Sequence, residues 1–202
     1  MEKSVWERIE SSRRHWDVLR HPFYRRWSAG ELSAEELARY SGQYRHAVVG
    51  VAELSERLAE TLPQRPELRE HAAEEQAHVG VWDGFVEKAG GDAAAEANRE
   101  TRACVDAWTA PGTPLELLGR LYAIESGQPA ISVTKRDGLL SSYGFEDGAG
   151  TAYFRVHSSR DLEHAAEVRG LADDLSADGG DDELVAGAEA AFRANWRLLD
   201  GV

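Results

Sequence analysis

The stretch YFRVHSSRDLEHAAEVRG, residues 153–170, places His157, Asp161 and His164 at positions i, i+4 and i+7. On an α-helix these three side chains lie within roughly 60° of one another, because each residue advances the helix by about 100°. We therefore predict a helix after residue 150 that presents two imidazoles and a carboxylate on one face. This face is a candidate for part of a metal site.

Two other stretches offer side chains of the same kinds. HAAEEQAHVGVW, residues 71–82, carries Glu74, Glu75 and His78, and LYAIESGQPAIS, residues 121–132, places Glu125 among apolar neighbours. Taken alone, the groups at 74–78 and 157–164 are also typical of solvated polar faces, but Glu125 is harder to explain, since an unpaired buried carboxylate is costly. Imidazole and carboxylate ligands suit iron or manganese. The three stretches together favour a metal site, in which His71 either orients a ligand or is one.

Apolar residues recur with helical spacing along the whole chain. We predict helices at 4–19, 33–60, 67–88, 92–108, 115–143, after residue 150 and up to residue 201, with 21–32 as a turn-containing connection. Ser33 and Glu36 form a capping box that fixes the start of one long helix. Pro129 predicts a bend beside Glu125. Because no period-two strand pattern occurs, we expect an all-α bundle of seven or eight helices, in one domain spanning residues 1–202.

Composition excludes several other classes of protein. The formal net charge of −13 and the absence of a basic block argue against a nucleic-acid partner. No run of 18 apolar residues exists and the N-terminus lacks a secretion signal, so we expect a cytoplasmic protein without membrane contact. Cys104 is the single cysteine, which excludes an internal disulfide and any thiolate-rich metal site. Any metal must therefore be held by histidines and carboxylates.

Four stretches carry a resemblance to a known family: HPFYRRWSAGEL (21–32), EEQAHVGVW (74–82), YAIESGQPAISVTKRDGL (122–139) and YFRVHSSRDLEHA (153–165). The chain resembles the heme-oxygenase-like di-metal oxidases and, among them, the branch of the chlamydial death-domain-associating protein. This resemblance implies an all-α, heme-oxygenase-like fold, usually in a homodimer. It also implies activation of O2 as a co-substrate at two bound irons, or at a manganese–iron pair, with an external reductant and without heme.

The resemblance also assigns ligands position by position. The residues that fall on family ligands are His78, Glu125, His157, Asp161 and His164. For the remaining carboxylate two positions stay open. Glu74 takes the ligand's place in sequence order, whereas Glu75 makes the Glu-x-x-His pair found in other members, and we prefer Glu75.

This branch makes 4-aminobenzoate for folate by cutting the ring out of one of its own tyrosines, with a lysine that supplies the amine. The resemblance implies that Tyr24 is the sacrificed tyrosine and Lys135 the lysine, and Tyr40 and Tyr153 match other tyrosines of the branch. The sequence departs from the branch where Tyr44 is followed by Arg45 instead of a second tyrosine. This departure affects the tyrosine chemistry and leaves the metal ligands unchanged.

Three alternatives stay open. Relatives with the same ligands oxidise an external amine, amino acid or fatty acid. A non-catalytic interaction protein is a second alternative, although it would have no reason to keep six inward ligands. Thiamin-degrading enzymes of the TenA type share the architecture but use a nucleophilic cysteine, which this chain lacks on the helix of Glu125.

Overall fold

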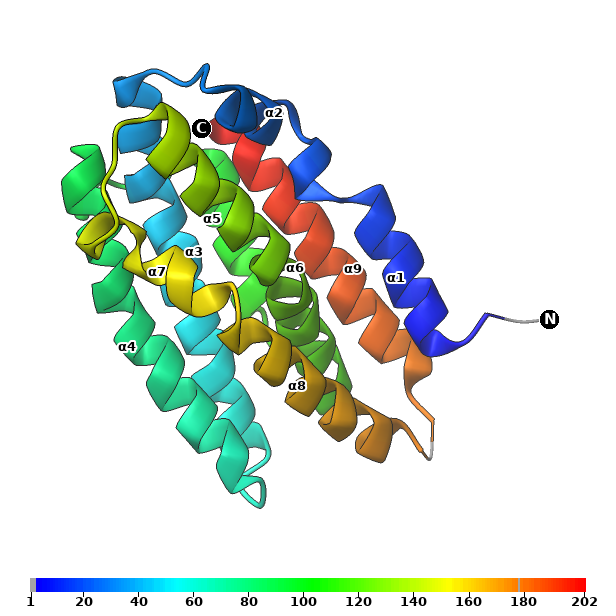
Figure 1. The fold of residues 1–202 in the computed structure, drawn as a ribbon. Coiled ribbons are helices and arrows are strands. Elements are labelled where there is room, and N and C mark those ends of the chain that lie inside the picture. Colours follow the sequence, from blue (N-terminus) through cyan, green and yellow to red (C-terminus); the bar gives the residue numbers. More distant parts are fainter. Residues whose placement is uncertain (1–2, 178) are drawn as a thin grey trace.

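The computed structural model describes residues 3–177 and 179–202, and within them it contains α-helices and no strand, which confirms the all-α prediction. The α-helices are α1 (Val5–His15), α2 (Pro22–Ala29), α3 (Ala34–Thr61), α4 (Pro66–Ala89), α5 (Arg99–Thr109), α6 (Pro114–Ser142), α7 (Ala149–His157), α8 (Arg160–Ser176) and α9 (Asp181–Leu198) (Figure 1). There are also two short 3₁₀ helices, Val18–Arg20 between α1 and α2 and Leu199–Gly201 directly after α9. None of the described helices has the length and apolar character that a membrane crossing requires.

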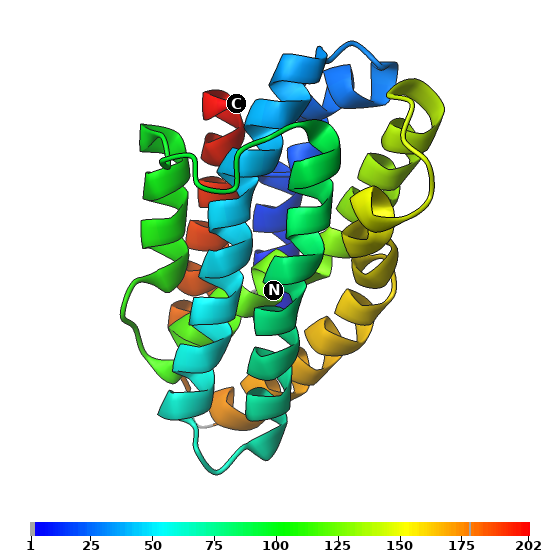
Figure 2. The same ribbon diagram turned by 90° about the vertical axis from the view of Figure 1, so that its left-hand side faces the viewer.

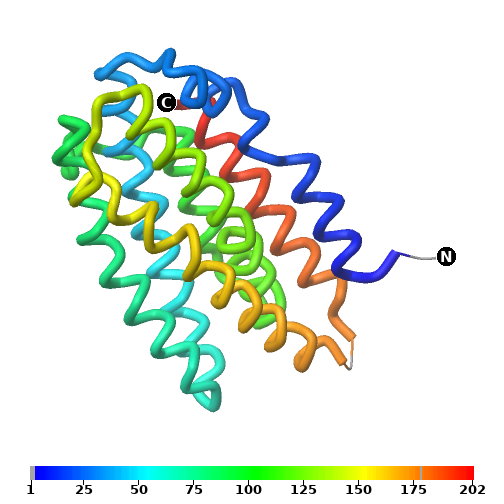
Figure 3. The backbone as a smooth tube through the Cα atoms, in the orientation of Figure 1, coloured from blue at the N-terminus to red at the C-terminus, as the bar shows by residue number. Residues whose placement is uncertain are grey.

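The helices form a bundle around α6. Figure 1 shows α3 and α4 on one side and α9 and α1 on the other, with α6 between them. After a turn of 90°, α3 and α4 stand side by side in front and α7 and α8 run along one edge (Figure 2). The backbone trace shows α7 leading directly into α8, which packs across α6 (Figure 3). Polar residues on α4, α6, α7 and α8 can therefore meet in the interior.

Local sequence signals set several of the helix starts. The predicted capping box of α3 is confirmed, since Ser33 Oγ accepts a hydrogen bond from the Glu36 backbone N–H at 3.1 Å and Glu36 accepts one from the Ser33 N–H at 2.8 Å. Thr113 and Glu116 form the same arrangement at the start of α6. Pro129 lies inside α6, which continues to Ser142, so this proline does not end the helix.

The helix expected to carry His157, Asp161 and His164 is in fact two helices, so that prediction is wrong in this respect. His157 is the last residue of α7, and Asp161 and His164 lie in α8. Ser158 and Ser159 form the turn between them, and each serine hydroxyl donates a hydrogen bond to the carbonyl three residues earlier. Such side-chain bonds compete with helical backbone pairing. The described residues contain nine α-helices, because this break and the additional short helix α2 add to the seven predicted helical stretches.

Two other segments also differ from the prediction. The expected connection 21–32 contains the helix α2, which starts with Pro22 at its first position and is capped by His21 Nδ1, the acceptor of a bond from the Phe23 N–H at 3.1 Å. The helix expected at 92–108 starts only at Arg99. Asn98 caps it by accepting a bond from the Thr101 N–H at 2.7 Å.

Glycines allow α6 and α9 to pack backbone against backbone. A Cβ atom on Gly119 of α6 would lie 2.2 Å from the carbonyl oxygen of Leu184, and one on Gly187 of α9 would lie 2.2 Å from that of Glu116. Only glycine fits such an approach. This contact fixes the position of α6, which carries Glu125 into the bundle.

We predict that Gly187→Ala destabilises the protein by about 1–3 kcal/mol, because the added methyl group must push two helices apart. Gly170 in α8 is the matched control, since a Cβ there meets no atom within 4 Å. Gly170→Ala should stabilise the protein by about 0.5–1 kcal/mol through helix propensity. Thermal or urea unfolding of both variants measures the difference, and equal effects would contradict the close packing of α6 on α9.

Candidate metal centre

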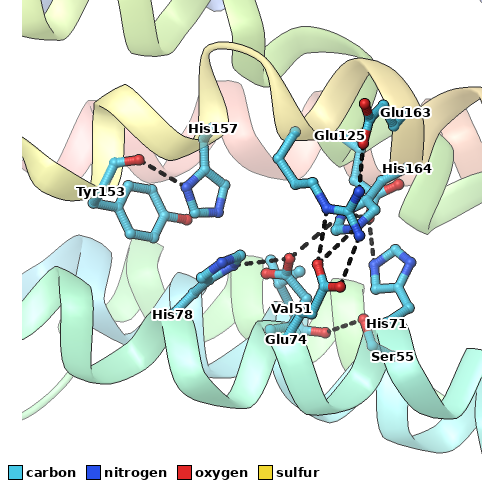
Figure 4. Close-up of polar contacts among 12 residues, drawn as sticks. Val51, Ser55, His71, Glu74, His78, Glu125, Tyr153, His157, Glu163 and His164 are labelled. Atoms are coloured by element: carbon cyan, nitrogen blue, oxygen red, sulfur yellow. Dashed lines mark hydrogen bonds and ion pairs between the residues drawn. The ribbon is translucent and has the colours of Figure 1, made fainter.

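Four helices bring the predicted ligands together. On α4, His71, Glu75 and His78 are spaced i, i+4 and i+7 and all point into the bundle, where they are buried. Glu125 of α6, His157 of α7 and both Asp161 and His164 of α8 are buried as well. In Figure 4, His78 and His157 face each other at one end of the cluster, and His71 and His164 at the other.

The first donor group consists of His71, Glu75, Glu125 and His164, whose candidate ligand atoms all lie within 4.8 Å of one another. Nδ1 of His164 lies 3.8 Å from Oε1 of Glu75 and 3.9 Å from Oε1 of Glu125. Nε2 of His71 lies 2.6 Å from Oε1 of Glu125, yet neither atom has a partner in hydrogen-bonding geometry. The ligand atoms of these four side chains therefore lie around one small region, which a single ion could occupy.

The second donor group consists of Glu75, His78 and His157, again with candidate ligand atoms within 4.8 Å of one another. His157 Nδ1 lies 2.8 Å from the carbonyl oxygen of Tyr153 and must donate to it, because a carbonyl only accepts. The proton is therefore on Nδ1, and Nε2 is left with a free lone pair. Glu75 belongs to both groups, so the two groups form one continuous cluster.

The two donor groups, together with Asp161, which belongs to neither, leave six buried donor or acceptor atoms without a hydrogen-bond partner. They are His71 Nε2, both carboxyl oxygens of Glu125, His157 Nε2, Asp161 Oδ2 and His164 Nδ1. Each unsatisfied buried polar atom costs about 1–3 kcal/mol, and more when it is charged. Cations at this position would satisfy all of them, and the mixture of imidazole and carboxylate fits iron or manganese. The residues present therefore fit a metal centre.

Burial sets the charge state of these groups. It raises the pKa of Glu125 well above its usual range, and that of Asp161 to about 9, with the nearby carboxylates adding to the effect. Burial likewise lowers the pKa of His71, and that of His157 to about 4. The imidazoles of His71 and His157 are thus neutral, which is the form that binds a metal, and a bound cation would displace the protons from the carboxyl groups.

Glu74 and Glu75 occupy different environments. Glu75 is buried in both donor groups, and its Oε1 lies 3.1 Å from Nδ1 of His78. Glu74 points away from the donor groups, its side chain is 38% exposed, and it pairs with Arg160 and His164. The preference for Glu75 in the Glu-x-x-His pair agrees with this geometry.

The four residues with predicted catalytic roles lie next to the cluster in an aromatic region. Lys135 is fully buried on α6 and its Nζ has no hydrogen-bond partner. Five ring centroids surround this nitrogen, those of Tyr44 at 4.2 Å, Trp82 at 5.3 Å, Tyr40 and Phe154 at 5.4 Å and Tyr24 at 5.8 Å. Burial lowers the pKa of Lys135 well below its usual range, which favours the uncharged amine.

Tyrosine hydroxyls and rings join this region to the donor groups. The hydroxyls of Tyr24 and Tyr40 lie 3.2 Å apart, and burial raises the pKa of both phenols, which stay protonated. The ring of Tyr153 stacks on His157 at 3.8 Å and meets Trp82 at 4.9 Å. Tyr153 therefore contacts both the second donor group and the aromatic region.

Sequence reasoning did not assign a role to Tyr44 or Trp82, although both pack around the Lys135 amine. Spacing could have identified them. Tyr44 follows Tyr40 by one helical turn in α3, and Trp82 follows His78 by one turn in α4.

Comparison with known proteins assigns the chain to a family. A family model described as "iron-containing redox enzyme" matches residues 65–196, the part of the chain that holds every candidate metal ligand. A protein of Chlamydia muridarum named 4-aminobenzoate synthase is 28% identical, with 85% of this chain and 79% of that protein covered. One with the same name from Nitrosomonas europaea is 27% identical, with coverages of 97% and 89%.

Solved structures support the fold. A domain from Shewanella denitrificans with a heme oxygenase-like fold superimposes with a TM-score of 0.80 at 21% identity, over 100% of this chain and 92% of that one. A TenA homologue from P. horikoshii gives a TM-score of 0.76 at 18% identity, over 96% and 97% of the two chains. The predicted heme-oxygenase-like fold is therefore confirmed. Because the family model spans more than half of the sequence, the chain belongs to the family of iron-containing redox enzymes.

Proposed function

We propose that the chain binds two metal ions, either two irons or a manganese–iron pair. The residues that would hold them are His71, Glu75, His78, Glu125, His157, Asp161 and His164, with Glu75 shared. When bound, such a pair reduces O2 and supplies the oxidising power for attack on an unactivated bond. The six unpartnered buried atoms support this proposal, as does membership of an iron-containing family.

The product we propose is 4-aminobenzoate, made from the chain's own Tyr24. Two relatives carry the name of that activity. Tyrosine already contains a benzene ring with a carbon substituent opposite a heteroatom. Conversion requires that the Cα–Cβ bond breaks, that Cβ becomes a carboxylate and that nitrogen replaces the phenol oxygen. The observation that carries the proposal is Lys135, a fully buried amine without a hydrogen-bond partner, 5.8 Å from the centroid of the Tyr24 ring. Its lowered pKa favours the uncharged form that such a reaction needs.

The surrounding side chains have roles that follow from their positions. Tyr40 holds the hydroxyl of Tyr24, and the Tyr44 ring lies against the Lys135 amine at 4.2 Å. Gln128 Nε2 lies 3.4 Å from the Tyr44 hydroxyl and helps to fix that ring. Complete burial keeps bulk water from the amine, which leaves its lone pair available for bond formation with the ring.

The alternatives have less support. The cavity beside α6, with a volume of about 40 Å³, is lined by Ile124 and Ile131 and by no metal-ligand candidate, so it offers an external substrate no direct contact with the donor groups. Cys104 is buried and burial raises its pKa, which argues against a TenA-type nucleophile. Membership of a redox enzyme family argues against a purely structural interaction protein. The homodimer, the external reductant and the cytoplasmic location stay predictions.

We predict that Tyr24→Phe abolishes the 4-aminobenzoate that the iron-loaded protein makes from O2 and reductant without added substrate. The phenol is the group that is converted, and a benzene ring without an oxygen cannot exchange it for nitrogen. Chromatography with mass detection measures the product, which should not exceed one molecule per chain because each chain has one Tyr24.

Tyr122→Phe is the matched control, since Tyr122 lies on α6 near Glu125 but packs against Trp6, outside the Lys135 region. It should give as much product as the wild type. Undiminished product from Tyr24→Phe would exclude Tyr24 as the source, and product in excess of the protein would point to an external substrate.

We also predict that Lys135→Met raises the stability of the metal-free protein at pH 7 by about 1–3 kcal/mol while abolishing the product, because the change removes an unsatisfied buried amine. The pKa of Lys135 is lower in the folded state than in the unfolded chain, so the unfolded state binds more protons. The contribution of Lys135 to the free energy of unfolding therefore increases with pH up to about 10.4 and decreases as the pH drops. In Lys135→Met, the free energy of unfolding should lack this part of its pH dependence.

Urea unfolding between neutral and alkaline pH measures this difference. Lys88→Met is the control, because Lys88 is an exposed lysine of α4. It should leave both stability and product unchanged. A loss of stability in Lys135→Met would show that the amine has a favourable partner and would contradict the uncharged state.

A further inference from the structure

The two ring nitrogens of His164 face different surroundings. Nε2 lies 3.1 Å from Oε2 of Glu74, whereas Nδ1 is buried without a partner and faces Glu75 and Glu125. A carboxylate can only accept a hydrogen bond, so Nε2 carries the proton. The lone pair is then on Nδ1, the nitrogen that faces the first donor group.

Arg160 holds Glu74 in place for this bond. Its Nε donates to Oε2 of Glu74 at 2.9 Å and its Nη2 donates to Oε1 at 2.7 Å, so both carboxylate oxygens are engaged. Arg160 is the first residue of α8 and Glu74 lies on α4, so the pair joins the two helices beside the cluster. The side chains of Glu74 and Arg160 are each 38% exposed, against 1% for His164.

These contacts give Glu74 a role other than that of a metal ligand. We infer that Arg160 and Glu74 are positioning residues, which hold His164 as the tautomer whose Nδ1 faces Glu75 and Glu125 and thereby strengthen metal binding in the first donor group. A carboxylate that accepts the far N–H of a ligand histidine fixes its orientation and makes the imidazole a better donor. The inference rests on the metal centre of the proposed function.

The test is titration of the metal-free protein with Co(II) in competition with a chelator, followed by visible absorption, which reports the ligands of each bound ion. Glu74→Ala removes the acceptor and should weaken binding of one of the two ions by about 10–100-fold. Glu74→Gln keeps an amide oxygen that can accept from Nε2, so it should restore most of the affinity and the wild-type spectrum. Both variants lose the charge pair with Arg160, so their metal-free forms should unfold at similar temperatures.

Glu163→Gln is the matched control, because Glu163 pairs with Arg160 but does not contact His164. It should bind Co(II) like the wild type. Unchanged affinity in Glu74→Ala would overturn the positioning role and leave the metal centre intact. Equal losses in Glu74→Ala and Glu74→Gln would also overturn it, since the charge or a direct ligand would then be what matters. A wild-type protein that binds no Co(II) would overturn the metal centre and the positioning role together.

Discussion

Three buried carboxyl groups share a small volume in the middle of this bundle. Glu75, Glu125 and Asp161 make no ion pair with lysine or arginine in the part of the chain that the structure describes. Carboxylates removed from water are unfavourable unless positive charge compensates them, and the neutral imidazoles of His71 and His157 supply none. The rest of the structure positions this cluster, from the glycine contact of α6 with α9 to the packing of α8 across α6. The pair of cations that we propose would offset this electrostatic cost.

The same burial governs the chemistry beside the cluster. Aromatic rings replace water around Lys135 and lower its pKa, and the rings of Tyr44 and Tyr24 lie 4.2 Å and 5.8 Å from its nitrogen. Tyr153 and Trp82 form a continuous aromatic contact between His157 and this region. A metal centre that oxidises a residue of its own chain needs such a dry, preorganised setting, since water would compete for the oxidised ring. On the proposed function, the site and its substrate Tyr24 are parts of one core.

Local sequence signals predicted the positions of most helices. Tertiary packing determines the remaining features, which these signals do not encode. The capping box at Ser33 fixes α3 within one turn, so that helix could be placed from sequence. The break at Ser158–Ser159 could not, because neither glycine nor proline marks it. Glu74 and Glu75 differ by about 100° of helix rotation, and only the neighbouring helices determine which one is buried. The full burial of Lys135 depends on rings from α2, α3, α4 and α7, which no sequence spacing brings together.

The most direct test of this account is the number of ferrous ions that the metal-free protein binds under anaerobic conditions, measured by titration and metal analysis. The account predicts about two per chain in the wild type, and loss of both in Glu75→Ala, since both donor groups contain Glu75. His157→Ala should keep the ion of the first donor group. Absence of iron above background in the wild type, or two ions retained in Glu75→Ala, would contradict a metal centre built around Glu75.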